Sequence, residues 1–418
     1  MGGGGQQQQP AKERKEVLID GMLYDVTSFR HPGGSIIKFL TNHGDATDAF
    51  HQFHLRSERA QKLLKVLPKR PAPKDVIAER GGNGQEGLAK AFAKLHSDLK
   101  AEGYFDPSMA EVAYRTLELV AIHALGAYFL MTATNVFSVI AGILCLAMGQ
   151  GRCGWLMHEG GHYSMTGNVA IDKAFQIVLY GVGCGMSAGW WRSQHNRHHA
   201  TPQKLQHDVD LETLPLVAFN TRIAERTKSP AVRAWLSMQH ILFIPVSCLL
   251  VALGWQLFLH PRYMLRTKKK FEFMTLFVRY YLLFGVVLQG YTWPAAIAIY
   301  LLYNGLSASY IFTNFALSHT HLPVTNPDEY LHWVEYASKH TTNITSSALC
   351  DWWMAYLNYQ IEHHLFPSMP QFRHPKIAGR VRKLFEDHGL VYDVRDYFAC
   401  LDDTLSNLAR VGNPDKAK

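Results

Sequence analysis

The sequence predicts a small N-terminal α+β domain followed by an all-α integral membrane domain, and three observations lead to this. Beyond Glu118, four long runs contain no Asp, Glu, Lys or Arg, whereas the chain before them is polar. Only 18% of the residues are charged, against about 25% in average soluble domains. Histidines gather in three short clusters beside the uncharged runs. We therefore expect a membrane domain that carries a histidine-rich polar cap.

The composition excludes several other classes of protein. Hydrophobic residues make up 48% of the chain and aromatic residues 12%, which excludes a disordered or fibrous protein. The balance of 42 Lys+Arg over 34 Asp+Glu gives a net charge of +8, and we expect a lipid bilayer as partner and no nucleic acid. Six cysteines are scattered without a CxxC pair, so a reducing compartment is the simpler interpretation.

Composition changes along the chain divide it into five segments. The start is rich in Gly and Gln, and Pro-rich and Gly-rich stretches interrupt the sequence near residues 68–73 and 81–84. Such stretches are typical of tethers between domains. The predicted segments are a disordered N-terminus (1–14), a compact polar domain (15–68), a linker with an amphipathic segment (69–112), the membrane domain (113–395) and a C-terminal tail (396–418).

The uncharged runs predict the membrane topology. A bilayer core requires about 20 mostly apolar residues per helix, so runs 119–151 and 280–327 each suit a hairpin of two spans. If the histidine clusters form one site, an even number of crossings must separate them, and runs 174–191 and 234–261 would then lie in the interface or re-enter. This arrangement keeps the basic cluster near 262–270 in the cytosol. We expect about four transmembrane helices plus interfacial helices; six spans or buried core helices are the alternatives.

The polar domain carries a candidate haem clip. His31 opens an HPGG turn, and His54 follows the stretch Asp45–Phe50. A haem held by two imidazoles requires neutral histidines on opposite walls of an apolar cleft, and neighbouring Ile, Leu and Phe residues can line that cleft. His51 is a second candidate for the later ligand. An ordinary surface turn is the alternative interpretation of the HPGG motif.

The histidine clusters supply an unusually large set of imidazoles. His158 and His162 are spaced i, i+4, which places both rings on one face of a helix. Adjacent histidines cannot share one helix face, but they can reach two neighbouring metals. One zinc takes three or four protein ligands, so eight imidazoles suit two metals better. The full candidate set is His158, His162, His195, His198, His199, His319, His363 and His364, with Asn314, Gln360 and His207 as outer-shell candidates.

Other interpretations of these clusters remain. HEGGH at 158–162 matches the HExxH pattern of zinc proteases, although its two glycines are poor helix formers. Histidines on solvated loops would explain the second and third clusters without any metal, and His319 could be a packing residue. A haem domain in the same chain favours redox chemistry and therefore iron among the metals that imidazole binds.

At this point the sequence resembles a front-end fatty acid desaturase with a fused N-terminal cytochrome b5 domain. The resemblance covers nearly the whole chain and rests on HPGG at 31–34, HEGGH at 158–162, QHNRHH at 194–199 and QIEHH at 360–364. Gln360, where other membrane desaturases have histidine, is especially specific. The longer strings around these motifs are most similar to delta-5 members, and delta-6 and delta-8 enzymes share much of them.

The resemblance implies a function and its cofactors. His31 and His54 would be the axial ligands of haem b, and the eight clustered histidines would hold two iron ions that use O2 as co-substrate. NADH–cytochrome b5 reductase would supply electrons at the cytosolic face of the endoplasmic reticulum membrane. A delta-5 enzyme would convert 20:3n-6 to arachidonate and 20:4n-3 to eicosapentaenoate, carried on CoA or phospholipid. Alternatives are a delta-6, delta-8 or sphingoid-base desaturase or a hydroxylase on the same scaffold, an electron carrier without catalysis, and the HExxH zinc protease.

Overall fold

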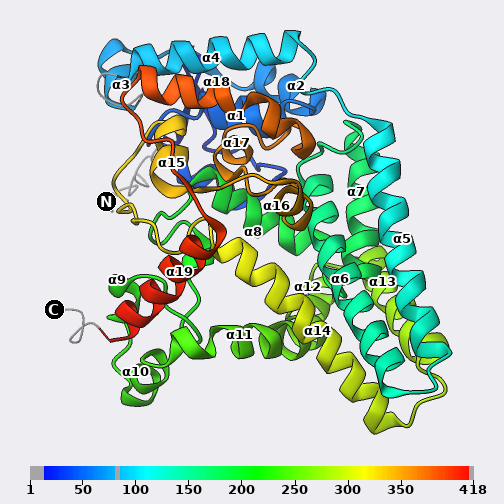
Figure 1. The fold of residues 1–418 in the computed structure, drawn as a ribbon. Coiled ribbons are helices and arrows are strands. Elements are labelled where there is room, and N and C mark those ends of the chain that lie inside the picture. Colours follow the sequence, from blue (N-terminus) through cyan, green and yellow to red (C-terminus); the bar gives the residue numbers. More distant parts are fainter. Residues whose placement is uncertain (1–13, 81–84, 414–418) are drawn as a thin grey trace, which may run out of the picture.

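A computed structural model of the chain describes residues 14–80 and 85–413. The predicted disordered N-terminus falls on residues 1–14 and, except for Arg14, lies outside the described residues. Part of the predicted tether (81–84) and the end of the predicted tail (414–418) also lie outside them. The described chain forms a small N-terminal domain, a helical membrane-type bundle and a polar cap between them (Figure 1).

The N-terminal domain is built on a three-stranded antiparallel sheet in the order β1-β2-β3. A tight turn joins β1 to β2, and Asp20 and Gly21 adopt positive φ there (50° and 70°), as a two-residue hairpin requires. The sheet buries apolar residues such as Val17 and Tyr24 against the helices of the domain. The elements are β1 (Glu16–Ile19), β2 (Met22–Asp25), a 3-10 helix η1 (Ser35–Phe39), α1 (Thr47–His54), α2 (Glu58–Val66) and β3 (Lys69–Pro71).

The segment 69–112, predicted as a linker with an amphipathic segment, contains regular structure. Its first residues form β3, which completes the sheet, and they are followed by α3 (Lys74–Arg80) and α4 (Glu86–Ala101). The apolar residues of α4 recur at helical spacing and form one stripe. That stripe is buried in the cap, where it forms a core with the later helices α17 (Gln360–Leu365) and α18 (His374–Asp387). Its buried residues are Leu88, Phe92, Leu95 and Leu99. Burial of this stripe fixes the segment in place.

Long apolar helices form the bundle at one side of the molecule (Figure 1). Among the described residues, three helices are long and apolar enough to cross a membrane, and a helix pair bent by 110° would be a fourth. The first two bundle helices form the predicted hairpin, with its turn at 132–135, but the first carries three charged residues in its N-terminal half. The bundle elements are α5 (Met109–Met131), α6 (Val136–Gly161), α7 (Val169–Val178), π-helix η2 (Leu179–Gly183), α8 (Ala188–Ala200), α11 (Gln239–Leu249), π-helix η4 (Leu250–Leu259), α12 (His260–Arg266), α13 (Lys270–Tyr280), π-helix η5 (Tyr281–Val287) and α14 (Trp293–Ala316).

The run 234–261, predicted to lie in the interface or to re-enter, is long and apolar enough in the structure to be a candidate span. Elements α11, η4 and α12 form one helical stretch, Gln239–Arg266, and its mean hydropathy of 2.2 is the highest of the three candidate spans. The run 174–191 lies in the bent pair, since α7 and η2 meet α8 at that 110° bend, and such a bend is compatible with the predicted re-entrant arrangement. The sequence therefore predicts a membrane domain correctly, but the choice of which runs cross is not the one that length and composition favour.

Most of the cap lies over the end of the bundle that faces the N-terminal domain, whereas α9 (Thr221–Ala224), α10 (Pro230–Leu236) and α19 (Tyr397–Gly412) lie beside α11 (Figure 1). The predicted C-terminal tail (396–418) contains a helix: Asp396 caps it by accepting hydrogen bonds from the Phe398 and Ala399 backbone amides, and Leu408 on that helix is fully buried. The cap elements are 3-10 helix η3 (Val209–Leu211), α9 (Thr221–Ala224), α10 (Pro230–Leu236), α15 (Trp333–His340), β4 (Asn343–Ile344), α16 (Ala348–Trp353), α17 (Gln360–Leu365), 3-10 helix η6 (Gln371–Arg373), α18 (His374–Asp387), β5 (Val394–Arg395, parallel to β4) and α19 (Tyr397–Gly412).

Candidate metal centre and haem site

Five histidines from three helices converge where the bundle meets the cap. They come from the end of α6, from α8 and from α17, and the five ligand atoms lie within 4.8 Å of one another. Nε2 of His199 is 3.0 Å from Nε2 of His195 and 3.0 Å from Nε2 of His363. Two metal ligands at right angles lie roughly 3 Å apart when the metal–nitrogen bonds are about 2.1 Å. This first histidine group, which fits a metal ion, is His158, His162, His195, His199 and His363.

A second histidine group adjoins the first. It consists of His198, His319 and His364, all buried, with ligand atoms again within 4.8 Å. The neighbours His198 and His199 on α8 contribute to different groups, as do His363 and His364 on α17. The rings of His199 and His364 stack with centroids 4.2 Å apart. The structure therefore brings all eight predicted histidines together in two adjacent groups.

Hydrogen bonds from outside the groups fix the orientation of several rings. Nδ1 of His198 lies 2.9 Å from Oδ2 of Asp208. Nδ1 of His319 donates to the His340 carbonyl at 2.8 Å, and the Gln371 side chain lies 2.9 Å from Nδ1 of His158. A bond at Nδ1 leaves Nε2 facing the group, which is how metal-binding histidines are usually held. The sequence reasoning missed Gln371 and His340 because nothing in the sequence shows that they contact His158 and His319, which lie far from them in the chain.

Burial favours the neutral form of these imidazoles, which is the form that binds metals; at His198 the facing carboxylates of Asp208 and Asp210 outweigh burial and raise the pKa to about 9. Burial lowers the pKa of His162 and of His319 to about 3. Burial is also the main cause of the lowered pKa of His363 and His364. Among the described residues, the first group consists of histidines alone, so its ligands carry no negative charge when the imidazoles are neutral.

The N-terminal domain holds a second imidazole pair. The ring centroids of His31 and His54 are 6.0 Å apart, with the ring planes at 86°. Metal–imidazole bonds of about 2 Å on both sides of one iron require centroids roughly 6 Å apart, so the pair fits axial ligation. Nδ1 of His54 bonds to the Phe50 carbonyl at 3.0 Å, whereas Nε2 of His51 lies 2.9 Å from Asp20. His51 is therefore engaged elsewhere.

Comparison with known proteins agrees with both sites. The sequence signature described as "Fatty acid desaturase" matches residues 114–396, and the signature "Cytochrome b5-like Heme/Steroid binding domain" matches residues 6–71. The chain belongs to the fatty acid desaturase family. It is an oxidoreductase with a fused haem domain, and the family together with the histidine groups assigns it a haem and a diiron centre as cofactors.

Individual relatives cover almost the whole chain. An "Acyl-lipid (8-3)-desaturase" of Rebecca salina is 57% identical over 408 residues, covering 97% of this chain and 93% of the relative. A protein of the same name from Thraustochytrium sp is 49% identical, covering 96% and 93%. An "Acyl-lipid 8-desaturase" of Rebecca salina is 27% identical, covering 94% and 91%. The chain is therefore a front-end desaturase with a fused cytochrome b5 domain, and its apolar helices fit a membrane protein.

The outer-shell candidates have different surroundings in this desaturase. Asn314 bonds to the Tyr310 carbonyl and accepts from the Tyr397 hydroxyl at 3.1 Å, which ties α14 to α19. His207 packs its ring on Phe39 of the haem domain, with centroids 4.5 Å apart. Gln360 is buried on α17, and its Oε1 has no hydrogen-bond partner among the described residues. The outer-shell roles of Asn314, His207 and Gln360 stay predictions.

The environment of Glu159 argues against the HExxH protease. In a zinc protease this glutamate must be free to act on water as a general base. Here Arg115 pairs with one oxygen of the Glu159 carboxylate, and the backbone amide of Gln371 donates to the other oxygen at 3.1 Å. His158 and His162 also belong to a five-histidine group, more than one zinc requires. The carboxylate serves to join α5, α6 and η6.

His374, which the sequence reasoning did not single out, borders the first group. It begins α18, is fully buried, and its ring centroid lies 5.9 Å from that of His363. Burial lowers its pKa to about 3. The signal that could have found it is the string FRHP that follows the third cluster.

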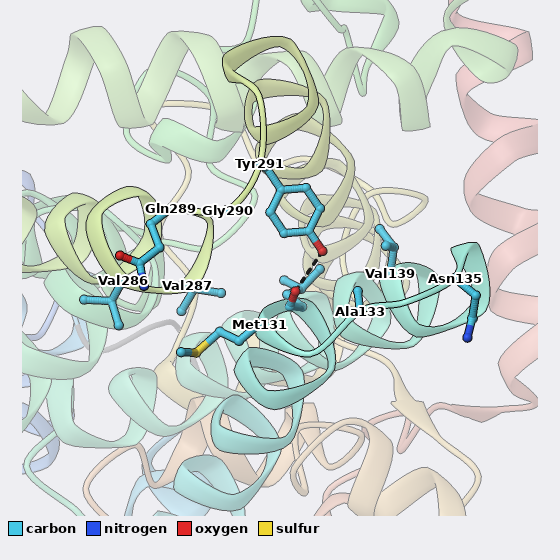
Figure 2. A pocket seen from close by; sticks show the side chains of 10 residues that line it. Met131, Ala133, Asn135, Val139, Val286, Val287, Gln289, Gly290 and Tyr291 are labelled. Atoms are coloured by element: carbon cyan, nitrogen blue, oxygen red, sulfur yellow. Dashed lines mark hydrogen bonds between the residues drawn. The ribbon is translucent and has the colours of Figure 1, made fainter.

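A cavity of about 370 Å³ lies at the far end of the bundle from the histidines. Figure 2 shows it between the α5–α6 turn and the loop that follows η5. The Tyr291 hydroxyl donates to the Leu130 carbonyl at 2.8 Å and joins the two turns. No residue of either histidine group lines this cavity, so it is separate from the reaction site.

Proposed function

We propose that the chain is a front-end acyl-lipid desaturase whose eight clustered histidines hold two iron ions. The observation that carries this proposal is the convergence of imidazole nitrogens in two adjoining groups, with 3.0 Å between Nε2 of His199 and Nε2 of each of two other histidines. The first group would hold one iron and the second group the other. The iron pair, when bound, supplies the activation of O2 that side chains alone cannot provide.

The chain's own residues prepare this site. Asp208, Gln371 and the His340 carbonyl hold three of the rings through Nδ1. The groups are buried between bundle and cap, which keeps water from the reacting centre. Overall, a CH2–CH2 pair, O2, two electrons and two protons yield a cis double bond and two waters. The apolar helices of the bundle would receive the acyl chain.

The haem domain supplies the electrons in this proposal. His31 and His54 would be the axial ligands, consistent with their 6.0 Å centroid separation. NADH–cytochrome b5 reductase is the proposed donor, acting at the cytosolic face of the endoplasmic reticulum. The basic stretch that runs from α12 into α13, which includes Arg262, Lys268 and Lys270, supports a cytosolic position for that end of the bundle.

The position of the new double bond has two candidates. The names of the relatives above contain the number 8, and none of them contains the term delta-5. Formation of a delta-8 bond has the more direct support in these names, through the 8-desaturase. The delta-5 prediction requires that (8-3) denotes a bond formed three carbons toward the carboxyl end from carbon 8. Both candidates share an acyl lipid as substrate and carbon 8 as the reference point.

Feeding experiments in a yeast without polyunsaturated acids separate the candidates. Cells that express the chain receive 20:2n-6, 20:3n-6 or 20:4n-3, and mass spectrometry of bond-locating derivatives identifies the products. A delta-8 enzyme converts 20:2n-6, whereas a delta-5 enzyme yields arachidonate from 20:3n-6 and eicosapentaenoate from 20:4n-3. The carrier follows from whether the new bond first appears in phospholipid or in acyl-CoA. Absence of any new double bond, with haem-loaded protein in the membrane, would overturn the proposed function.

A further inference from the structure

The haem domain is packed against the cap through buried polar contacts. Gln52 on α1 is only 1% exposed, and its carbonyl accepts a hydrogen bond from the Ser368 hydroxyl at 2.8 Å. Arg56 donates to the Phe105 carbonyl, and Asp48 lies 3.2 Å from Nε2 of His332. A buried polar group that is left without its hydrogen-bond partner destabilises the structure. These contacts therefore favour one fixed position of the domain.

Aromatic contacts extend the same interface along the haem domain. His43 stacks on Tyr330 with ring centroids 5.1 Å apart and planes at 13°. Phe39 lies against His207 and beneath the guanidinium of Arg197, which is 5.0 Å from its ring centroid. Tyr330 also contacts Gly44, where a Cβ would meet its ring at 3.2 Å. The interface thus runs from η1 to the start of α2.

Phe53 lies at the centre of this interface and reaches the first histidine group. It directly precedes His54 in α1. Its ring centroid is 6.5 Å from that of His199 and 5.8 Å from that of Trp333, with both contacts edge-to-face at 87°. His199 is the histidine whose Nε2 approaches two others of its group. One aromatic side chain therefore bridges the residue next to a haem ligand and a proposed iron ligand.

We infer that the haem domain delivers electrons from this docked position and that Phe53 is the positioning residue through which they pass to the His199 side. The inference rests on the proposed function, because it assumes haem at His54 and iron at His199. Each transfer takes one electron from ferrous haem, leaving ferric haem, and reduces the histidine-held centre by one electron. Two transfers per double bond supply the two electrons of the overall reaction. Electron tunnelling falls steeply with the width of the gap, which Phe53 fills with a contiguous aromatic contact.

The first test locks the docked position. His43→Cys and Tyr330→Cys are introduced together in the full-length, haem- and iron-loaded protein and bridged with a short bis-maleimide. The haem is reduced, and its re-oxidation after addition of acyl substrate and O2 is followed by stopped-flow absorbance. We expect the bridged protein to re-oxidise its haem at the rate of the unbridged double variant. Arrest of re-oxidation by the bridge would overturn the docked position. Wild-type protein treated with the same reagent controls for the native cysteines.

The second test changes the bridging side chain. Phe53→Ala should slow haem re-oxidation by about tenfold or more, because a small displacement of reacting groups has effects of this size. Phe53→Trp should restore most of the rate, which a purely structural role would not predict. The haem spectrum and the reduction of the haem by dithionite should remain those of the wild type. Ser368→Ala, which removes a docking hydrogen bond but no aromatic contact, is the matched control.

The outcomes separate this inference from the proposed function. A Phe53→Ala protein that re-oxidises its haem at the wild-type rate overturns the inference and leaves the desaturase assignment intact. Wild-type protein that forms no double bond in yeast overturns the proposed function instead. An altered haem spectrum in Phe53→Ala would mean that Phe53 serves only to hold the haem cleft, which also overturns the inference.

Discussion

The haem clip and the paired histidine groups both depend on imidazole, yet they are assembled in different ways. His31 and His54 belong to one small domain and meet across its own cleft, with ring centroids 6.0 Å apart. The eight other histidines come from α6, α8, α17 and the segment after α14, and several of them are oriented by residues outside the clusters. A site built within one domain depends on local sequence, whereas a site built between elements depends on the packing of the whole protein.

Removal of a central imidazole from the first histidine group should have the largest effect on activity. His199→Ala takes away the ring whose Nε2 faces His195 and His363 at 3.0 Å and which stacks on His364. We expect iron content to fall sharply and product to drop below detection, while the haem absorbance stays unchanged. Elemental analysis and fatty-acid profiles measure both. The control is His388→Ala, because His388 lies at the end of α18 and outside both groups; it should change neither the iron content nor the product. Retention of full iron content in His199→Ala would contradict the ligand assignment.

The haem clip offers the reciprocal change. His54→Ala should remove the haem absorbance and, with it, electron supply, but it should leave the iron content intact because the histidine groups are formed by other elements. His51→Ala is the matched control, since His51 bonds to Asp20 on the domain surface and should keep the haem. Absorbance spectra of the two purified proteins give the answer. Loss of haem in His51→Ala rather than in His54→Ala would reverse the assignment of the second ligand.

An intermediate effect is expected one step outside the metal groups. Asp208→Asn keeps the size of the side chain but removes the charge that faces Nδ1 of His198 at 2.9 Å. Loss of such an outer partner typically costs about 10–100-fold in metal affinity or activity. Activity measured against added ferrous iron should show a weaker apparent affinity. Asp210→Asn, whose carboxylate lies 3.4 Å from the same nitrogen but is 62% exposed, should have a smaller effect; equal effects would assign the orienting role to both residues.

The same contrast explains how much of the molecule the sequence predicts. His31, His54 and the three clusters stand out because their spacing within short segments is itself chemical information. Gln371, His340 and the burial of Glu159 by Arg115 do not stand out, because they depend on contacts between residues far apart in the chain. The two-domain order and the apolar helices follow from composition, but the choice of spanning runs does not. Charge-free length alone cannot distinguish a bent pair from a straight span.

The predicted tether gives the smallest and most local test of this contrast. Phe92 on α4 is fully buried against Phe366, with ring centroids 5.4 Å apart. Phe92→Ala should destabilise the cap by about 3–5 kcal/mol, the usual cost of removing a buried phenylalanine. Thermal unfolding of the purified protein measures the change. Lys90→Ala on the exposed face of the same helix should stay within about 0.5 kcal/mol. If both variants unfold like the wild type, α4 acts only as a spacer. A loss of thermal stability in Phe92→Ala alone means that the segment between the domains belongs to the cap and helps to hold the haem domain over the histidine groups.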